Sequence, residues 1–129
     1  MLLFIPLLTA ALAVSLSPNF LPARAHVSSY CRSNCKNIAT ALKMYAEDNG
    51  GRYPTVLSHL TRGNYLKLIP TCPAAGSATY AVEYQTNHKP DRFSFCCAGN
   101  NHAKIYSGFS TNSNNYPQYN SEYGLQEHP

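Results

Sequence analysis

The sequence predicts a small α+β domain, in which one helix lies across a three-stranded antiparallel sheet and an apolar segment precedes the helix. Three observations predict it: an uncharged apolar start, a stripe of apolar residues at helical spacing, and a later change to an alternating pattern. The chain has 129 residues, of which 44% are hydrophobic and only 12% are charged. This length allows one small domain and excludes a multidomain enzyme.

Residues 1–17 form the apolar segment, whose only polar side chains are Thr9, Ser15 and Ser17. A helix of that length is about 25 Å long, whereas the hydrocarbon core of a membrane is about 30 Å thick. Two alternatives stay open, a secretory signal cut after residue 25 and a retained membrane anchor, with a buried core helix as a weaker third. The motif Ala23-Arg24-Ala25 has the form of a cleavage site, but no basic residue precedes the apolar run.

The net charge of +4 is concentrated after this segment. Four basic residues precede the first acidic residue, Glu47, and the other six cancel the six acidic ones; the four are Arg24, Arg32, Lys36 and Lys43. A nucleic-acid-binding domain more often interleaves basic residues with aromatic ones over one face, so we expect no nucleic-acid partner. Positive charge beside an apolar segment is typical of a membrane edge, where we place Arg24 and Arg32.

A helix is expected from about residue 27 to residue 47. Apolar side chains recur there every three or four residues and form one stripe: Val27, Cys31, Cys35, Ile38, Leu42 and Tyr45. Asn49-Gly50-Gly51 ends the pattern, because glycine readily adopts the left-handed conformation that follows a last helical turn. Pro18 and Pro22 predict a kink between this helix and the apolar segment.

The sheet is expected over about residues 79–109, after a short helix within 54–60. Apolar and polar residues alternate over 80–85 and again over 93–97, and residues 88–91 between them predict a turn. A third strand is expected near 104–109. Residues 110–129 are rich in Asn, Tyr, Ser and Gln and predict an irregular tail, whose tyrosines at 116, 119 and 123 cover the domain or contact a neighbouring subunit.

Nearly the whole chain resembles one known family. Residues 17–54 read SPNFLPARAHVSSYCRSNCKNIATALKMYAEDNGGRYP and resemble the middle of the N-terminal helix in bacterial type IV pilins and type II secretion pseudopilins. The step at Pro18-Asn19-Phe20 and the later segment Ile69-Pro70-Thr71-Cys72-Pro73 are its most specific parts. When Pro18 is set on the family's proline, Met1 falls where members carry a glutamate, so the leader and the start of the mature helix are expected to be missing.

The resemblance implies a pilin-like α+β fold, with a long N-terminal helix, apolar in its first half, packed on a small antiparallel sheet. Residues 1–25 would be a transmembrane and assembly helix, and residues 26–129 a globular domain. The implied function is a structural subunit of a type IV pilus-like or type II secretion pseudopilus filament, anchored as a single-pass protein in the bacterial inner membrane before it polymerises with like subunits. The residues expected to pack in the filament are Leu2, Leu3, Ile5, Leu8, Leu12, Leu16, Pro18, Phe20 and Pro22. The alternative is a secreted, disulfide-stabilised binding module that has lost residues 1–25.

The chain has five cysteines, an odd number, so at least one thiol is free or pairs between chains. Because export favours oxidised thiols, we expect a disulfide between Cys72 and Cys97, with buried free thiols as the alternative. Cys31 and Cys35 lie one helical turn apart, where an unstrained bridge is not expected, and packing is the expected role of Cys35. Cys96 faces away from Cys97 and is the candidate for the remaining free thiol.

No cofactor, metal or catalytic site is expected from the sequence. A zinc site can be drawn from Cys31, Cys35, Cys72, Cys97 and His102, but these residues lack the paired, closely spaced ligands of structural zinc sites. No run of alternating acidic residues predicts calcium. Catalytic pairs such as Cys96 or Cys97 with His102, or Ser94 with His88 and Asp91, lack the accompanying motifs, so no enzyme is predicted.

Overall fold

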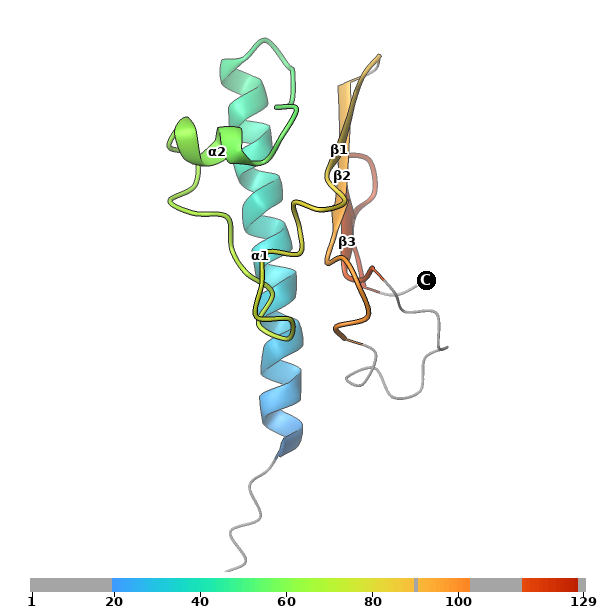
Figure 1. Cartoon of the computed structure of the whole chain (residues 1–129). Helices are drawn as coiled ribbons and strands as arrows, with labels where there is room; N and C mark the ends of the chain where they lie inside the picture. The colour runs from blue at the N-terminus through green and yellow to red at the C-terminus, as the bar shows by residue number, and fades with distance from the viewer. Residues whose placement is uncertain (1–19, 90, 103–114, 128–129) are drawn as a thin grey trace, which may run out of the picture.

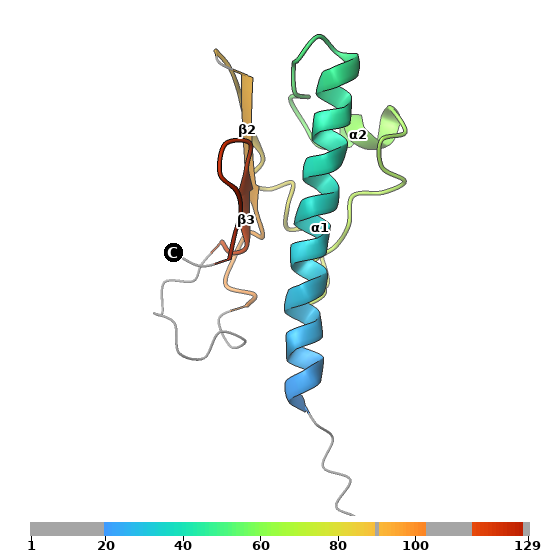
Figure 2. The ribbon, with the colours of Figure 1, turned by 180° about the vertical axis from the view of Figure 1, so that it is seen from behind.

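The computed structural model describes residues 20–89, 91–102 and 115–127 of the chain. A central helix lies between a sheet on one side and a short helix with its following loop on the other, as the opposite views of Figures 1 and 2 show. The elements in chain order are α1 (Phe20–Asp48), α2 (Ser58–Arg62), β1 (Gln85–His88), β2 (Asp91–Cys96), β3 (Gln118–Asn120) and β4 (Gly124–Gln126).

Helix α1 forms where the apolar stripe was expected, and it includes residues 27–47. Most residues of the stripe are fully buried, and Ala39, Ala41 and Ala46 are buried beside them. These alanines are buried because α1 is covered on two sides, by α2 on one side and by β3 and β4 on the other. The helix ends where Gly50 and Gly51 adopt positive φ angles of 68° and 84°, which allows the Gly51 amide to donate to the Ala46 carbonyl at 2.7 Å.

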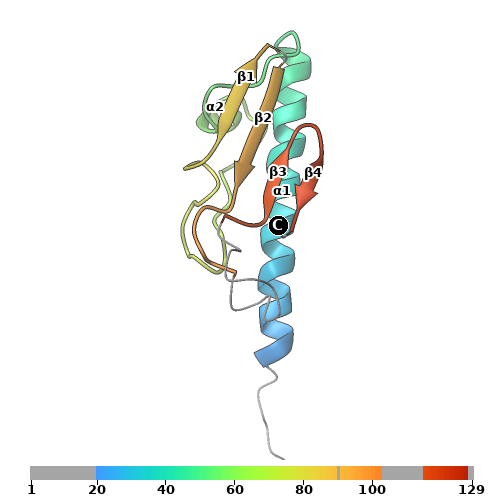
Figure 3. The ribbon, with the colours of Figure 1, turned by 90° about the vertical axis from the view of Figure 1, so that its right-hand side faces the viewer.

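The sheet is antiparallel throughout and has the strand order β1-β2-β3-β4. Its hairpin β1–β2 turns between His88 and Asp91, where the sequence predicted a turn. In Figure 3, β3 and β4 lie over α1, and β1 lies at the far edge of the sheet. The inner face carries Phe93, Phe95 and Tyr119, whose ring planes lie within 13° of one another with centroids 5.9–6.1 Å apart. These rings form the main apolar contact surface of the sheet toward the helix.

The strands differ from those expected. The segment 80–84 forms turns, and β1 begins only at Gln85, although Tyr80 and Tyr84 still point into the core or its margin. The tail expected to be irregular contains β3 and β4, which extend the sheet beyond β2. Only Tyr119 and Leu125 of these strands pack against the core, too few to give an alternating pattern. The strand expected over 104–109 lies outside the described residues.

The predicted fold class, a pilin-like fold with a long helix that is apolar in its first half, is wrong. The described helix begins at Phe20 and carries Arg24, His26 and Arg32 among several serines in its first half. Within the described residues the sheet already has four strands in place of the three expected. Residues 1–19 lie outside the described part of the chain, and with them most of the residues expected to pack in a filament: Leu2, Leu3, Ile5, Leu8, Leu12, Leu16 and Pro18. Phe20 and Pro22 lie in the first turn of α1, where proline is tolerated.

The predicted location, a single pass through the bacterial inner membrane, also needs correction. Among the residues that the structure describes, no helix combines the length and the apolar character needed to cross a membrane. Arg32, expected at the membrane edge, forms an ion pair with Glu127 at 3.0 Å and so joins α1 to the segment that follows β4. Arg24 lies in the second turn of α1.

Candidate metal centre

Three separate parts of the chain bring Cys31, Cys72, Cys97 and His102 together in the core. Cys31 lies on the buried stripe of α1, and Cys97 directly follows β2. Cys72 lies in the loop after α2, where its amide donates to the Ser77 carbonyl at 2.9 Å and its carbonyl accepts from the Gly76 amide at 2.8 Å. The turn from Cys72 to Ser77 therefore fixes the backbone on which this thiol is carried.

The segment from Cys97 to His102 is held by its own hydrogen bonds. The Cys97 amide donates to the Pro117 carbonyl at 2.9 Å, which joins this segment to the one before β3. The Asn101 side chain donates to the Ala98 carbonyl at 2.8 Å and closes a short turn. This turn directs the His102 ring back toward Cys97 and Cys72, where its Nε2 atom lies 3.4 Å from the Cys72 sulfur and 3.5 Å from the Cys97 sulfur.

The four donor atoms have the spacing of a tetrahedral metal site. The three sulfurs and one imidazole nitrogen all lie within 4.8 Å of one another. Zinc lies about 2.3 Å from a sulfur ligand and about 2.0 Å from a nitrogen ligand. In a tetrahedron these bond lengths place a sulfur and a nitrogen about 3.5 Å apart, and two sulfurs about 3.8 Å apart. The two printed edges, from His102 Nε2 to the Cys72 and Cys97 sulfurs, therefore match those of a Cys3His zinc tetrahedron, and the other pairs of donor atoms lie within 4.8 Å.

Each of the three sulfurs also has a hydrogen-bonding neighbour from outside the four-residue set. The Tyr80 hydroxyl lies 3.0 Å from the Cys31 sulfur, and the Thr79 hydroxyl lies 3.2 Å from the Cys97 sulfur. The side-chain amide of Asn101 donates to the Cys97 sulfur at 3.7 Å. A hydrogen bond from the Ala75 backbone lowers the pKa of the Cys72 thiol. Donors around the sulfurs stabilise thiolates and orient metal ligands.

The pKa values in this cluster show how strongly the four groups interact. Hydrogen bonds from Cys31 and Cys97 hold the pKa of Cys72 far below its ordinary range, against the opposing effect of burial. The pKa of Cys31 is raised, first by its neighbour Cys35 and then by Cys72, and that of Cys97 is raised by Cys31 and Cys72. One thiolate is thus favoured, and further ionisation is opposed by charge repulsion in a buried site.

The histidine of the cluster compensates this negative charge with a proton. Burial lowers the pKa of His102, but hydrogen bonds to Cys72 and Cys97 outweigh that effect and raise the pKa to about 9. A cation is therefore favoured at the centre of the sulfurs. A metal ion would take the place of this proton and would also allow the remaining thiols to ionise.

The site is closed to solvent and has one unpaired polar atom. All three cysteines are 0% exposed and His102 is 1% exposed. Among the described residues, no group accepts or donates a hydrogen bond at His102 Nδ1, although this atom is buried. A site with four protein ligands and no access for water has the character of structural, not catalytic, zinc sites.

All four residues belong to the zinc set that can be drawn from the sequence, where their wide spacing predicted against such a site. The disulfide predicted between Cys72 and Cys97 is wrong, because both are free thiols that face His102. The fifth candidate, Cys35, is buried but is not part of the set. The spacing of Cys97 and His102, with four residues between them, was the one local signal; Cys31 and Cys72 come from distant parts of the chain.

Comparison with models of protein families, with curated proteins and with solved structures gave no match.

The residues considered for catalysis do not form a catalytic group in the described part of the chain. His88 Nδ1 and the Asp91 carboxylate are hydrogen-bonded at 3.0 Å at the hairpin tip, while Ser94 lies opposite Gln85, farther along the strands. Cys97 and His102 do approach each other, but within the four-ligand cluster. Cys96 faces the other side of the sheet, as expected, and burial raises its pKa to about 11, so it is a poor nucleophile at neutral pH.

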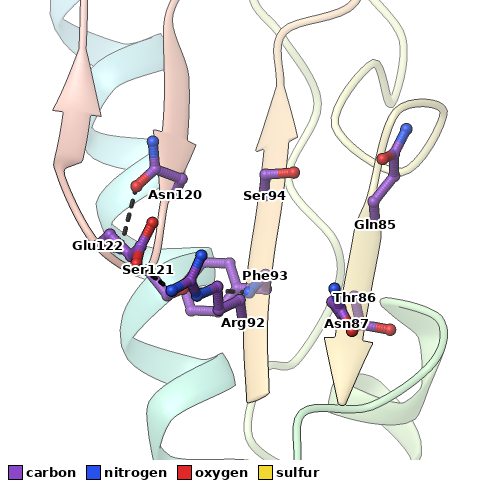
Figure 4. Close-up of a pocket in the computed structure, with 9 residues that line it drawn as sticks. All are labelled: Gln85, Thr86, Asn87, Arg92, Phe93, Ser94, Asn120, Ser121 and Glu122. Atoms are coloured by element: carbon purple, nitrogen blue, oxygen red, sulfur yellow. Dashed lines mark hydrogen bonds and ion pairs between the residues drawn. The ribbon is translucent and has the colours of Figure 1, made fainter. Parts of the chain in front are cut away.

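One hollow on the described surface lies away from the cluster, on the outer face of the sheet. It has a volume of about 260 Å³ and is bordered by residues of β1, β2 and the β3–β4 turn (Figure 4). Its polar groups largely bind one another: Arg92 pairs with Glu122 at 2.8 Å, and the Phe93 amide donates to the Ser121 hydroxyl at 3.2 Å. The cluster in the core therefore remains the better candidate site.

Proposed function

We propose that this chain is a zinc-stabilised structural domain without catalytic activity, which binds one Zn²⁺ through Cys31, Cys72, Cys97 and His102. The observation that carries the proposal is the presence of four ligand atoms within 4.8 Å of one another, all on buried residues, with a further hydrogen-bonding group beside each sulfur. Three thiolates and one imidazole are a common ligand set of structural zinc sites.

The chemistry of the ligands favours zinc over most other ions. Thiolate and imidazole ligands suit zinc, copper and iron, while magnesium and calcium require oxygen ligands. Tetrahedral placement with no vacant position suits an ion with no preferred geometry and no redox chemistry, which describes Zn²⁺. Three thiolates and Zn²⁺ leave a net charge of −1, which the hydroxyls of Thr79 and Tyr80 and the Asn101 amide partly offset.

The ion would connect three parts of the domain that already meet in one core. Cys31 is on the central helix, Cys72 is on the loop that covers one side of it, and Cys97 and His102 follow the sheet on the other side. A bond from each to one ion fixes the helix, the loop and the sheet relative to one another. Zinc binding adds about 10 kcal/mol or more in small zinc-dependent domains, so even a fraction of it would matter here.

Metal analysis of the purified protein tests this proposal. Native mass spectrometry should find one zinc ion per chain in protein prepared without chelator, and none in the Cys72→Ala variant. The Cys35→Ala variant is the matched control, since Cys35 is equally buried but lies outside the set; it should keep its zinc. Wild-type protein that refolds fully but binds no zinc at micromolar free zinc would show that the four residues only pack together.

The filament role predicted from the resemblance stays a prediction. Its assembly residues lie almost entirely at positions 1–19, outside the described residues, and none of the contacts above bears on it.

A further inference from the structure

The site has a fourth thiol near it, that of Cys35, whose role the zinc proposal leaves open. Cys35 lies one turn after Cys31 on α1, is 0% exposed and belongs to the same core cluster. Two side chains four residues apart on one helix face can bind a single ion, as paired histidines do in helical zinc motifs. Cys35 lies outside the four atoms that are within 4.8 Å of one another, so it becomes a ligand only if its side chain or the centre rearranges.

His102 is the ligand of the four with the least support from its surroundings. A metal-binding histidine usually donates its second ring N–H to a carboxylate, a carbonyl or water, and that bond fixes the ring. In the described structure His102 Nδ1 has no such partner, although it is buried. Each of the three sulfurs, in contrast, has a hydrogen-bonding partner from outside the set. The imidazole is thus the ligand that is most easily replaced.

We propose that the same centre binds a thiophilic divalent cation of the Cd²⁺ class in a second mode, in which Cys35 replaces His102 and four thiolates hold the ion. The inference rests on the proposed zinc site and adds a selective response to soft cations. Soft ions gain more from a thiolate than from an imidazole, whereas zinc binds both well. Relative to the zinc mode, Cys35 loses its thiol proton and the imidazole leaves the ion, so the site carries a net charge of −2.

Cadmium binding to the full chain tests the second mode. The ultraviolet thiolate-to-Cd²⁺ absorption counts bound thiolates, and for the wild-type protein it should correspond to four. In Cys35→Ser it should fall by roughly a quarter, to three thiolates, because the hydroxyl is a poor ligand for a soft ion. Cys96→Ser removes a buried thiol on the other face of the sheet and is the control, with an unchanged count.

A measurement on the wild-type protein avoids any dependence on variants that fold poorly. Scalar couplings between bound ¹¹³Cd and the β-protons of its cysteine ligands identify those ligands directly, and a coupling to Cys35 is expected. Couplings to Cys31, Cys72 and Cys97 only, with a bond to His102, would overturn this inference and leave the zinc proposal intact. Failure to bind zinc as well as cadmium would instead overturn the proposed function.

Discussion

Replacement of Cys72 by alanine separates a metal site from a group of packed thiols. Cys72 and Cys35 are both 0% exposed in the same core, so loss of either sulfur removes a similar amount of buried contact, about 1 kcal/mol. Only Cys72 belongs to the four-donor set. If zinc is present at about a thousand times its dissociation constant, its binding adds about 4 kcal/mol to the free energy of unfolding.

We expect the two variants to differ in their free energy of unfolding when zinc is present, and not when it is removed. In a zinc buffer Cys72→Ala should lower the free energy of unfolding by about 5 kcal/mol, and Cys35→Ala by about 1 kcal/mol. In excess chelator both variants should lose about 1 kcal/mol relative to the chelated wild-type protein. Urea unfolding followed by circular dichroism gives all six values. Equal losses for the two variants in both buffers would refute the metal account, because packing alone would then explain Cys72.

Three further outcomes are expected. Thr79→Val keeps the shape of the side chain but removes the hydroxyl beside the Cys97 sulfur, so zinc affinity in a competition assay should fall about 10-fold or more; an unchanged affinity would show that this bond does not support the site. Cys96 should react very slowly with iodoacetamide at pH 8, because a pKa of about 11 leaves about one thousandth of it as thiolate; rapid labelling of the folded protein would contradict its burial. Glu127→Gln should lower stability by no more than about 1 kcal/mol, since its ion pair with Arg32 is half-exposed, and a larger loss by thermal unfolding would show that the pair is more important than its exposure indicates.

The local patterns of the sequence located several elements well. Helical spacing of apolar residues marked the buried face of α1, and Gly50 and Gly51 marked its end. Alternation over 93–97 placed Phe93 and Phe95 on the inner face of the sheet, as the structure has them. These features depend on neighbours a few residues away, and for that reason a single sequence is enough to reveal them.

Features that depend on distant contacts were missed or misjudged. Strands β3 and β4 are stabilised by pairing with β2, and their own residues are mostly polar, so no local pattern marks them. The cluster needs Cys31 and Cys72 next to Cys97, and only the packed positions of α1, the loop and the sheet determine that. The expected export of the protein favoured a disulfide between Cys72 and Cys97. Because a third thiol and an imidazole lie at the same point, a metal site is the better interpretation of these residues.

The most direct test of the central proposal is X-ray absorption at the zinc edge of the purified protein. The account predicts one zinc ion per chain, with three sulfur neighbours at about 2.3 Å and one nitrogen neighbour at about 2.0 Å. The nitrogen shell should be lost or replaced by oxygen in His102→Ala, while the sulfur shell remains. A zinc ion surrounded by oxygen and nitrogen atoms alone, or protein that holds no zinc, would contradict it.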